Sequence, residues 1–265
     1  KVLPKERTGD SQARARFERE MQAVGRVCHP HVVQAYDARD IDGTTVLVME
    51  YADGLDLAKA LARHGRLPVA EACEAVRQAA AGLQCAHENG LVHRDIKPSN
   101  LMLTRHGAVK VLDLGLARLE LQQHDGGELT SAGQPMGTAD YMAPEQAADS
   151  RTADIRADVG PLGCTLYKLL SGRAPFVGPK YQTPVQKMFA HMSDQPPPLE
   201  GLRPDVPAAL ASVVRRMMAK PPAERYETPA DAAAALAPFA AGADLRRLVA
   251  VAAGDAQPVL LRDSD

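Results

Sequence analysis

The first fifth of the chain combines one helical and two strand-like hydrophobic patterns. From Ser11 to Val27, apolar residues recur every three or four positions with Arg and Glu between them, which predicts an amphipathic helix. Two segments rich in β-branched residues, 32–36 and 45–51, flank Asp42-Gly43, a pair that readily takes the positive φ angles of a tight hairpin turn. We therefore expect a small helix-plus-sheet unit that closes near Tyr51.

After Gly54 the pattern becomes mainly helical. Helices are predicted over 55–63 and 69–88, and Asn89-Gly90 is a natural stop for the second. Short apolar segments between polar loops follow at 91–92, 101–103 and 109–112, and then come further helical patterns at about 162–171, 207–219 and 228–240. These patterns predict an α+β fold of two unequal lobes joined at 50–54.

Three parts of the chain are predicted. Residues 1–51 form a small, antiparallel-sheet lobe with one helix, and residues 52–240 form a large, mainly helical lobe. Residues 241–265 mix Ala and Gly with isolated charges, so we expect a weak helix followed by a frayed tail.

Composition and charge exclude several classes of partner. The 265 residues, 45% of them hydrophobic, suffice for a substantial buried core. The net charge is -2 and no Lys/Arg run exceeds two residues, so we expect no nucleic-acid partner. No apolar segment approaches the roughly 20 residues that span a bilayer, which predicts a cytoplasmic chain, although a longer parent could be membrane-anchored. The four scattered cysteines are predicted to be reduced and structural.

The sharpest chemical signal is the string His93-Arg94-Asp95-Ile96-Lys97-Pro98-Ser99-Asn100. It fits H-R-D-x-x-x-x-N, in which the Asp accepts the proton of a substrate hydroxyl and the Asn holds magnesium. The plain alternative is a polar loop after a helix, but four fixed residue types within eight positions make a chance match rare. On this string the chain resembles the protein kinase superfamily, which implies a bilobal fold and the cofactors ATP and Mg²⁺.

Two further motifs follow in the order that this family uses. Asp113-Leu114-Gly115 matches the D-F-G element with Leu in place of Phe, and a carboxylate at a strand end can bridge magnesium to the β- and γ-phosphates. The segment 137–145, Gly-Thr-Ala-Asp-Tyr-Met-Ala-Pro-Glu, resembles the end of an activation segment. By the same resemblance, Glu145 pairs with Arg225 in a structural, buried ion pair.

The resemblance also implies an ion pair in the small lobe. Lys1 occupies the place of the family's strand Lys, and Glu20 that of the helix Glu with which it positions the α- and β-phosphates. Glu18 is the rival for the second role, although Phe17-Glu18-Arg19-Glu20 fits the family pattern better through Glu20. For Lys1 the alternative is a frayed terminal residue with no fixed partner.

The segment 46–54 resembles a kinase hinge. Met49 is the gatekeeper in this reading, and Glu50 and Ala52 offer main-chain groups to adenine. Met102, two residues after Asn100, is implied to form the floor of the adenine site, although an apolar residue there is equally well explained as core.

The family resemblance also bears on substrate and regulation. Lys97 marks serine/threonine rather than tyrosine specificity, because its ammonium can contact the γ-phosphate beside a short hydroxyl substrate, and Thr138 agrees with that choice. Arg94 implies a cationic site for a phosphorylated activation segment, with Thr130 and Ser131 as the candidate phosphate carriers.

Asp158 matches the Asp that opens the family's central large-lobe helix and braces the catalytic loop. The match is imperfect, since Gly160-Pro161 stands where related sequences carry an aromatic residue and a Ser. This pair lowers helix propensity outside the first turn, so we expect a shifted or less stable helix start.

The full family that the chain resembles most is the eukaryotic-like serine/threonine kinases of bacteria, over residues 1 to about 240. The predicted function is therefore phosphoryl transfer from ATP to Ser/Thr hydroxyls of protein substrates, with Asp95 as base. The chain starts after the place of the family's Gly-x-Gly-x-x-Gly loop, so the alternative is a weak or inactive nucleotide-binding or scaffolding module. A phosphotransferase for a small molecule is the third hypothesis, disfavoured by Thr138 and Ala143-Pro144-Glu145. The physiological substrate and the oligomeric state are not predicted.

Overall fold

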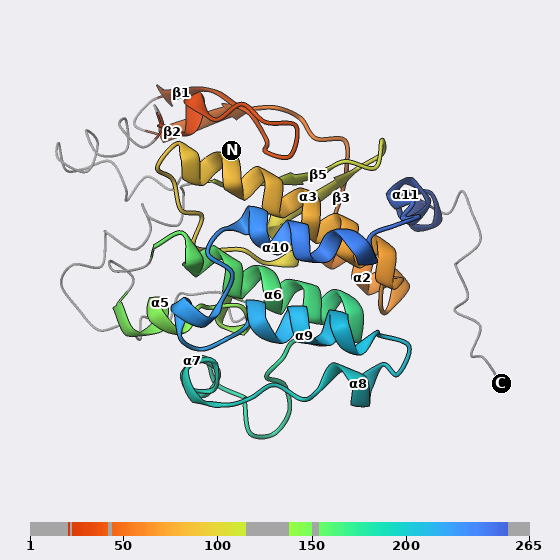
Figure 1. Ribbon diagram of the computed structural model, residues 1–265. Helices are drawn as coiled ribbons and strands as arrows, with labels where there is room; N and C mark the ends of the chain where they lie inside the picture. Colours follow the sequence, from red (N-terminus) through yellow and green to blue (C-terminus); the bar gives the residue numbers. More distant parts are fainter. Residues whose placement is uncertain (1–20, 22, 42–43, 115–137, 150–153, 254–265) are drawn as a thin grey trace.

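The small lobe consists, as far as it is described, of a helical segment and a two-stranded sheet. The structure is a computed structural model that describes residues 21, 23–41, 44–114, 138–149 and 154–253. Residues 21 and 23–26 are helical, in agreement with the end of the predicted helix 11–27. Strands β1 (Ala35–Ile41) and β2 (Thr44–Met49) pair antiparallel and lie at one end of the molecule (Figure 1).

The predicted hairpin is confirmed, but its first strand is misplaced. The expected bounds of this strand, 32–36, are wrong, because β1 begins only at Ala35 and continues through polar residues to Ile41. Val32 and Val33 are instead buried beside strand β5 (Val109–Val111), where Val33 donates its N–H to the carbonyl of Val111 at 2.9 Å. Val32 also forms an isolated parallel β-bridge with Val111, so this segment pairs with β5 and not with β2. The turn residues Asp42 and Gly43 lie outside the described part.

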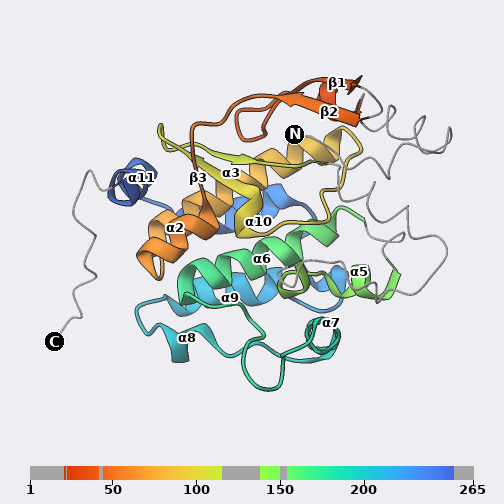
Figure 2. The ribbon, with the colours of Figure 1, turned by 180° about the vertical axis from the view of Figure 1, so that it is seen from behind.

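The large lobe is built around helices that lie side by side, seen from the side in Figure 1 and from behind in Figure 2. Helix α3 occupies Val69–Glu88, as predicted, and Gly90 follows it with a φ of 75°. The other described helices and helical turns are α2 Leu57–His64, η2 Pro98–Asn100, η4 Thr138–Asp140, α5 Pro144–Asp149, α6 Arg156–Ser171, α7 Pro184–Ser193, α8 Leu199–Leu202, α9 Ala208–Met217, η5 Pro222–Glu224, α10 Pro229–Leu236, η6 Ala237–Phe239 and α11 Leu245–Ala253.

A second sheet begins where a helix was expected. The predicted helix 55–63 starts later, because residues Gly54–Asp56 form strand β3, which pairs with β4 (Leu101–Thr104) and through it with β5. Asp56 then caps α2, its carboxylate accepting the N–H of Lys59 at 2.8 Å. Of the three short apolar segments, 101–103 and 109–112 coincide with β4 and β5, whereas 91–92 carries no strand.

The start of α6 also differs from prediction. The helix was expected over 162–171 but begins at Arg156, so Pro161 lies inside it rather than in its first turn. Proline lacks the N–H that would bond to the carbonyl of Ala157, and such a position usually costs about 3 kcal/mol. Burial of almost the whole helix against its neighbours is the stabilisation that offsets this cost.

The end of the described chain packs against the large lobe. The prediction of a helix in 241–265 is confirmed by α11, which contacts α2 and β4 and buries Leu245, Leu248 and Val249. Residues 254–265, the predicted frayed tail, lie outside the description. The boundaries of the three predicted parts stay predictions.

The two larger apolar clusters follow the two lobes, and a third consists of Ala143 and Ala157. The larger joins α2, α3, α6, α9, α10 and the second sheet, and the smaller contains Met21, Val24 and Val27 together with Leu47 and Leu114. This fold is α+β, with a small antiparallel sheet at one end and a mainly helical large lobe. None of the helices in the described ranges combines the length and the apolar character needed to span a bilayer.

Candidate functional site

The loop between α3 and β4 gathers three of the predicted catalytic residues around one carboxylate. Lys97 Nζ lies 3.0 Å from Asp95 Oδ1 and 2.8 Å from Oδ2. The amide nitrogen of Asn100 donates to Asp95 Oδ2 at 2.9 Å and to the Asp95 carbonyl at 2.8 Å. Because η2 turns the chain between Pro98 and Asn100, residues five positions apart meet side by side. The carboxylate of Asp95 is thus oriented by two donors while it stays partly exposed.

His93 connects this loop to the strand that carries the next motif. Its ring is fully buried, and Nε2 lies 2.7 Å from the carbonyl of Leu112, while the N–H of Asp95 donates to Nδ1 at 3.2 Å. These partners require the tautomer with the proton on Nε2. Leu112 also donates its N–H to the carbonyl of Asn100 at 2.9 Å. Both main-chain polar groups of Leu112, the residue before Asp113, are therefore fixed by the loop.

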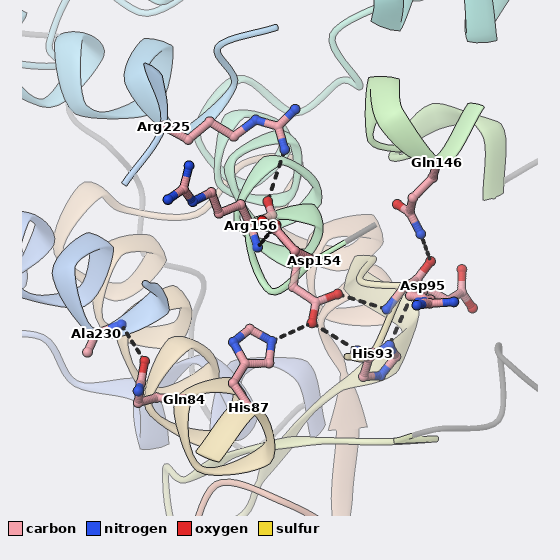
Figure 3. A network of polar contacts seen from close by, with 11 residues as sticks. Gln84, His87, His93, Asp95, Gln146, Asp154, Arg156, Arg225 and Ala230 are labelled. Carbon is pink, nitrogen blue, oxygen red and sulfur yellow. Dashed lines mark hydrogen bonds and ion pairs between the residues drawn. The ribbon is translucent and has the colours of Figure 1, made fainter. Parts of the chain in front are cut away.

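Asp158, in the first turn of α6, binds the backbone of this loop. Its Oδ2 accepts from the N–H of His93 at 2.9 Å and its Oδ1 from the N–H of Arg94 at 2.8 Å. His87 of α3 donates through Nε2 to Oδ2 at 2.8 Å, so helices α3 and α6 meet at this carboxylate (Figure 3). Full burial alone would raise the pKa of Asp158, but these hydrogen bonds and the nearby histidines lower it. The predicted bracing position is thereby occupied as expected.

Gln146 of α5 also binds the backbone of this loop. Its amide nitrogen donates to the carbonyl of Arg94 at 2.9 Å (Figure 3). Its amide oxygen accepts the N–H of Ala143 at 3.1 Å. The peptide groups on either side of Arg94 are thus held by α6 and by α5. Neither His87 nor Gln146 was predicted as a site residue, because their partners lie more than 50 positions away along the chain.

Asn100 and Asp113 offer the donor chemistry that magnesium prefers. The amide nitrogen of Asn100 is engaged by Asp95, which leaves its oxygen as the ligand atom, and Asp113 supplies a carboxylate at the end of β5. Oxygen ligands from one or two side chains are the usual protein contribution to a magnesium site that also binds phosphates. The described residues contain no group of three or more His, Cys, Asp or Glu suited to a metal. The two residues therefore fit magnesium held jointly with a nucleotide.

The predicted hinge lies between β2 and β3. Glu50 donates its N–H to the carbonyl of Gln34 at 2.8 Å, so its carbonyl is the main-chain group left for adenine. No hydrogen bond is formed by the backbone of Ala52 within the described ranges. Met49, at the end of β2, packs against the smaller apolar cluster. Glu50 and Ala52, the main-chain positions proposed for adenine, thus lie on the segment that connects β2 to β3.

An unpredicted ion pair ties this hinge to the large lobe. Lys110 Nζ of β5 lies 2.7 Å from Glu50 Oε1 and 2.9 Å from Oε2, and Gln34 donates its N–H to Oε2 at 3.2 Å. Partial burial works to raise the pKa of Glu50, but the hydrogen bonds from Lys110 and Gln34 lower it on balance.

Met102 shares a face of the second sheet with Lys110. The two are cross-strand partners, and the neighbouring Leu101 and Leu103 point into the large core with no exposure. Because side chains alternate along a strand, Met102 faces away from that core and toward the side of the hinge. The alternative of plain large-lobe core is therefore disfavoured.

Several predicted site residues fall outside the described part of the chain. They are Lys1, Glu20, its rival Glu18, Thr130 and Ser131. Thr138 begins η4, but its side chain is likewise outside the description. The roles assigned to these residues stay predictions.

The predicted pair of Glu145 and Arg225 is confirmed. Both oxygens of Glu145 accept from the guanidinium, at 2.6 and 2.7 Å, and the Arg225 side chain has no exposure. Gly160 lies beside this group, and a Cβ there would be in ordinary van der Waals contact with the guanidinium carbon, at 3.4 Å.

Comparison with known proteins agrees with this geometry. Residues 1–236 match the model of the protein kinase domain family. The chain is 36% identical over 235 residues to the serine/threonine-protein kinase PknB of Mycolicibacterium smegmatis and to that of Mycobacterium leprae, covering 87% of this chain. It is 36% identical over 244 residues, 89% of this chain, to the probable serine/threonine-protein kinase PknB of Corynebacterium glutamicum. The chain spans only 37% of the length of each of these relatives.

Proposed function

Because the chain belongs to the protein kinase domain family, we propose that it transfers the γ-phosphate of ATP to serine and threonine hydroxyls of protein substrates. One observation carries the proposal: the carboxylate of Asp95 is held by Lys97 and Asn100 on a loop whose backbone is fixed by Asp158 and Gln146. A partly exposed carboxylate so oriented suits a base that meets a substrate hydroxyl.

In the proposed reaction the substrate hydroxyl oxygen forms a bond to the γ-phosphorus. The bond from that phosphorus to the oxygen it shares with the β-phosphate breaks, and ADP leaves with that electron pair. The hydroxyl proton passes to Asp95, and the ammonium of Lys97, 2.8 Å from Asp95, offsets negative charge on the transferred group. Thr138 is proposed to lie on the protein-substrate side of this loop.

The nucleotide is proposed to lie between the hinge and the second sheet. Main-chain groups of Glu50 and Ala52 would contact the adenine edge, with Met49 behind it and Met102 beneath it. Lys1 and Glu20 are proposed to position the α- and β-phosphates. Asn100 and Asp113 would hold Mg²⁺, which neutralises charge on the β- and γ-phosphates when bound. Cytoplasmic location stays a prediction from the sequence.

Phosphoamino-acid analysis tests the proposal. The full-length protein is incubated with γ-labelled ATP, Mg²⁺ and a mixed histone preparation as a generic basic substrate. We expect label in phosphoserine and phosphothreonine and none in phosphotyrosine. Absence of transfer, with ATP still raising the melting temperature, would favour the nucleotide-binding module instead.

A further inference from the structure

A partly buried ion pair joins α7 to the turn that contains Thr138. Lys187 of α7 pairs with the carboxylate of Asp140 in η4, and the two side chains are only 12% and 16% exposed. Water screens such a pair less than a surface pair, so its geometry is better defined than that of exposed ion pairs. Asp140 is therefore held in place by a residue of a different element.

A second residue of α7, His191, also contacts Asp140. His191 follows Lys187 by four positions and so lies on the same face of the helix. Its buried ring meets Phe176 edge-on at 4.8 Å and forms a hydrogen bond with the backbone of Asp140. Burial lowers the pKa of His191 to about 4, with Lys220 and Lys187 acting in the same direction, so this contact involves a neutral ring at physiological pH.

Helix α7 is itself anchored at both ends. A capping box of Thr183 and Gln186 closes its start. At its other end Lys220 Nζ donates to the carbonyls of Ala190 at 3.2 Å and His191 at 2.8 Å. The large lobe thus fixes the helix, and the helix can fix η4.

The segment after Thr138 is consequently attached at two places. Asp140 is bound to α7, and Gln146, six positions further on, is bound to the carbonyl of Arg94. We propose that Lys187 is a positioning residue for the protein substrate: by holding Asp140 it sets the place of the Thr138–Asp140 turn relative to the loop that carries Asp95. This inference rests on the proposed function.

The ion pair of Lys187 and Asp140 should affect the protein substrate and not ATP. The hinge and the adenine floor come from β2, β4 and the segment after β2, none of which contacts Lys187 through a described hydrogen bond or ion pair. Loss of the pair should therefore weaken use of the protein substrate and leave use of ATP unchanged.

Steady-state kinetics of Lys187→Met in the full-length protein test this. With the mixed histone preparation as substrate, we expect the KM for histone to rise about tenfold, equivalent to about 1.4 kcal/mol, with the KM for ATP within about twofold of the parent. Lys187→Arg should restore most of the loss. Asp140→Asn should raise the same KM, and the double variant should be no worse than either single variant.

Lys180→Met is the matched control. Lys180 forms another ion pair of this region, to Asp194 at 2.7 Å, but it is 72% exposed and the pair does not involve η4. The variant Lys180→Met should leave the KM for histone and the KM for ATP unchanged. An unchanged KM for histone in Lys187→Met, or an equal rise in the KM for ATP, would overturn the proposal. No transfer by the parent protein would instead refute the proposed function.

Discussion

Arg94 and Asp113 have backbone angles that are unusual for their residue types. Their φ values are 67° and 57°, and no other non-glycine residue in the described ranges has a positive φ. Such conformations cost about 1–3 kcal/mol each and persist where surrounding contacts determine them. Asp158 and Gln146 hold the peptides around Arg94, and His93 and Asn100 hold the main-chain groups of Leu112, which precedes Asp113. The strain therefore lies at the proposed catalytic centre.

His191 makes stability depend on pH. Its pKa in the folded protein is about 4, below the ordinary 6.5, so the unfolded chain binds more protons between these values and stability falls as pH falls through this window. We expect the free energy of unfolding at pH 5 to be lower by about 2 kcal/mol than at pH 7.5 because of this group.

Urea unfolding of His191→Leu at both pH values measures this contribution. The variant should lose about 2 kcal/mol less than the parent between pH 7.5 and pH 5. His106→Leu replaces an exposed histidine and should keep the parent's dependence. Equal pH dependence of the parent and His191→Leu would contradict the prediction.

The residues of the site were predictable where they share one string. Asp95, Lys97 and Asn100 fall within six positions, and a family pattern at that spacing names all three. His87, Gln146, Lys110 and Lys187 act on partners that are distant in sequence, and each residue type is common on helix and strand surfaces. Only the fold brings them together, so no short pattern could identify them.

At the scale of elements, α3 approaches the loop before β1 very closely. A Cβ at Gly82 would lie 2.4 Å from the carbonyl oxygen of His31, a distance that the backbone there cannot absorb without moving. Glycine at this point allows the largest helix to contact the segment that leads into the small sheet.

Gly82→Ala should therefore destabilise the protein despite the better helix propensity of alanine. We expect a loss of about 1–3 kcal/mol in the free energy of unfolding, because overpacking outweighs a propensity gain of about 1 kcal/mol. Gly201→Ala is the matched control, since Gly201 is also helical and a Cβ there would meet nothing within 4 Å. Equal stability of the two variants would show that α3 can move away from His31.

Elements were predictable where the hydrophobic period was long and uninterrupted. The bounds of α3 follow from its period and its Asn89-Gly90 stop. The start of α6 was missed because Gly160-Pro161 argues locally against a helix that tertiary burial nevertheless stabilises. Strand β1 was misplaced because Val32 and Val33 are buried for a reason other than strand pairing with β2.

At the scale of the whole molecule, Arg225 joins segments that are far apart in the chain. Besides Glu145 it donates to the carbonyls of Ala219 at 2.7 Å, Arg156 at 2.9 Å and Lys220 at 3.1 Å. The end of the activation segment, the start of α6 and the turn after α9 therefore meet at one buried guanidinium. Figure 3 shows its contact with Arg156.

Arg225→Met should be strongly destabilising. Removing one partner of a buried pair leaves Glu145 and three carbonyls without their donor, for which we expect a loss of about 3–5 kcal/mol in the free energy of unfolding. Arg105→Met is the control, because the pair of Arg105 and Asp53 is 70% and 52% exposed and should contribute about 1 kcal/mol or less. Similar urea midpoints for both variants would contradict the role given to Arg225.

The proposed activity depends on both lobes, but its chemistry depends on one carboxylate. The most direct measurement is the initial rate of label transfer from γ-labelled ATP to histone by the parent protein and by Asp95→Asn, each with its ATP-induced rise in melting temperature. We predict a rate about 10²- to 10⁴-fold lower in Asp95→Asn with the rise in melting temperature retained. Equal rates in the two proteins would contradict the account.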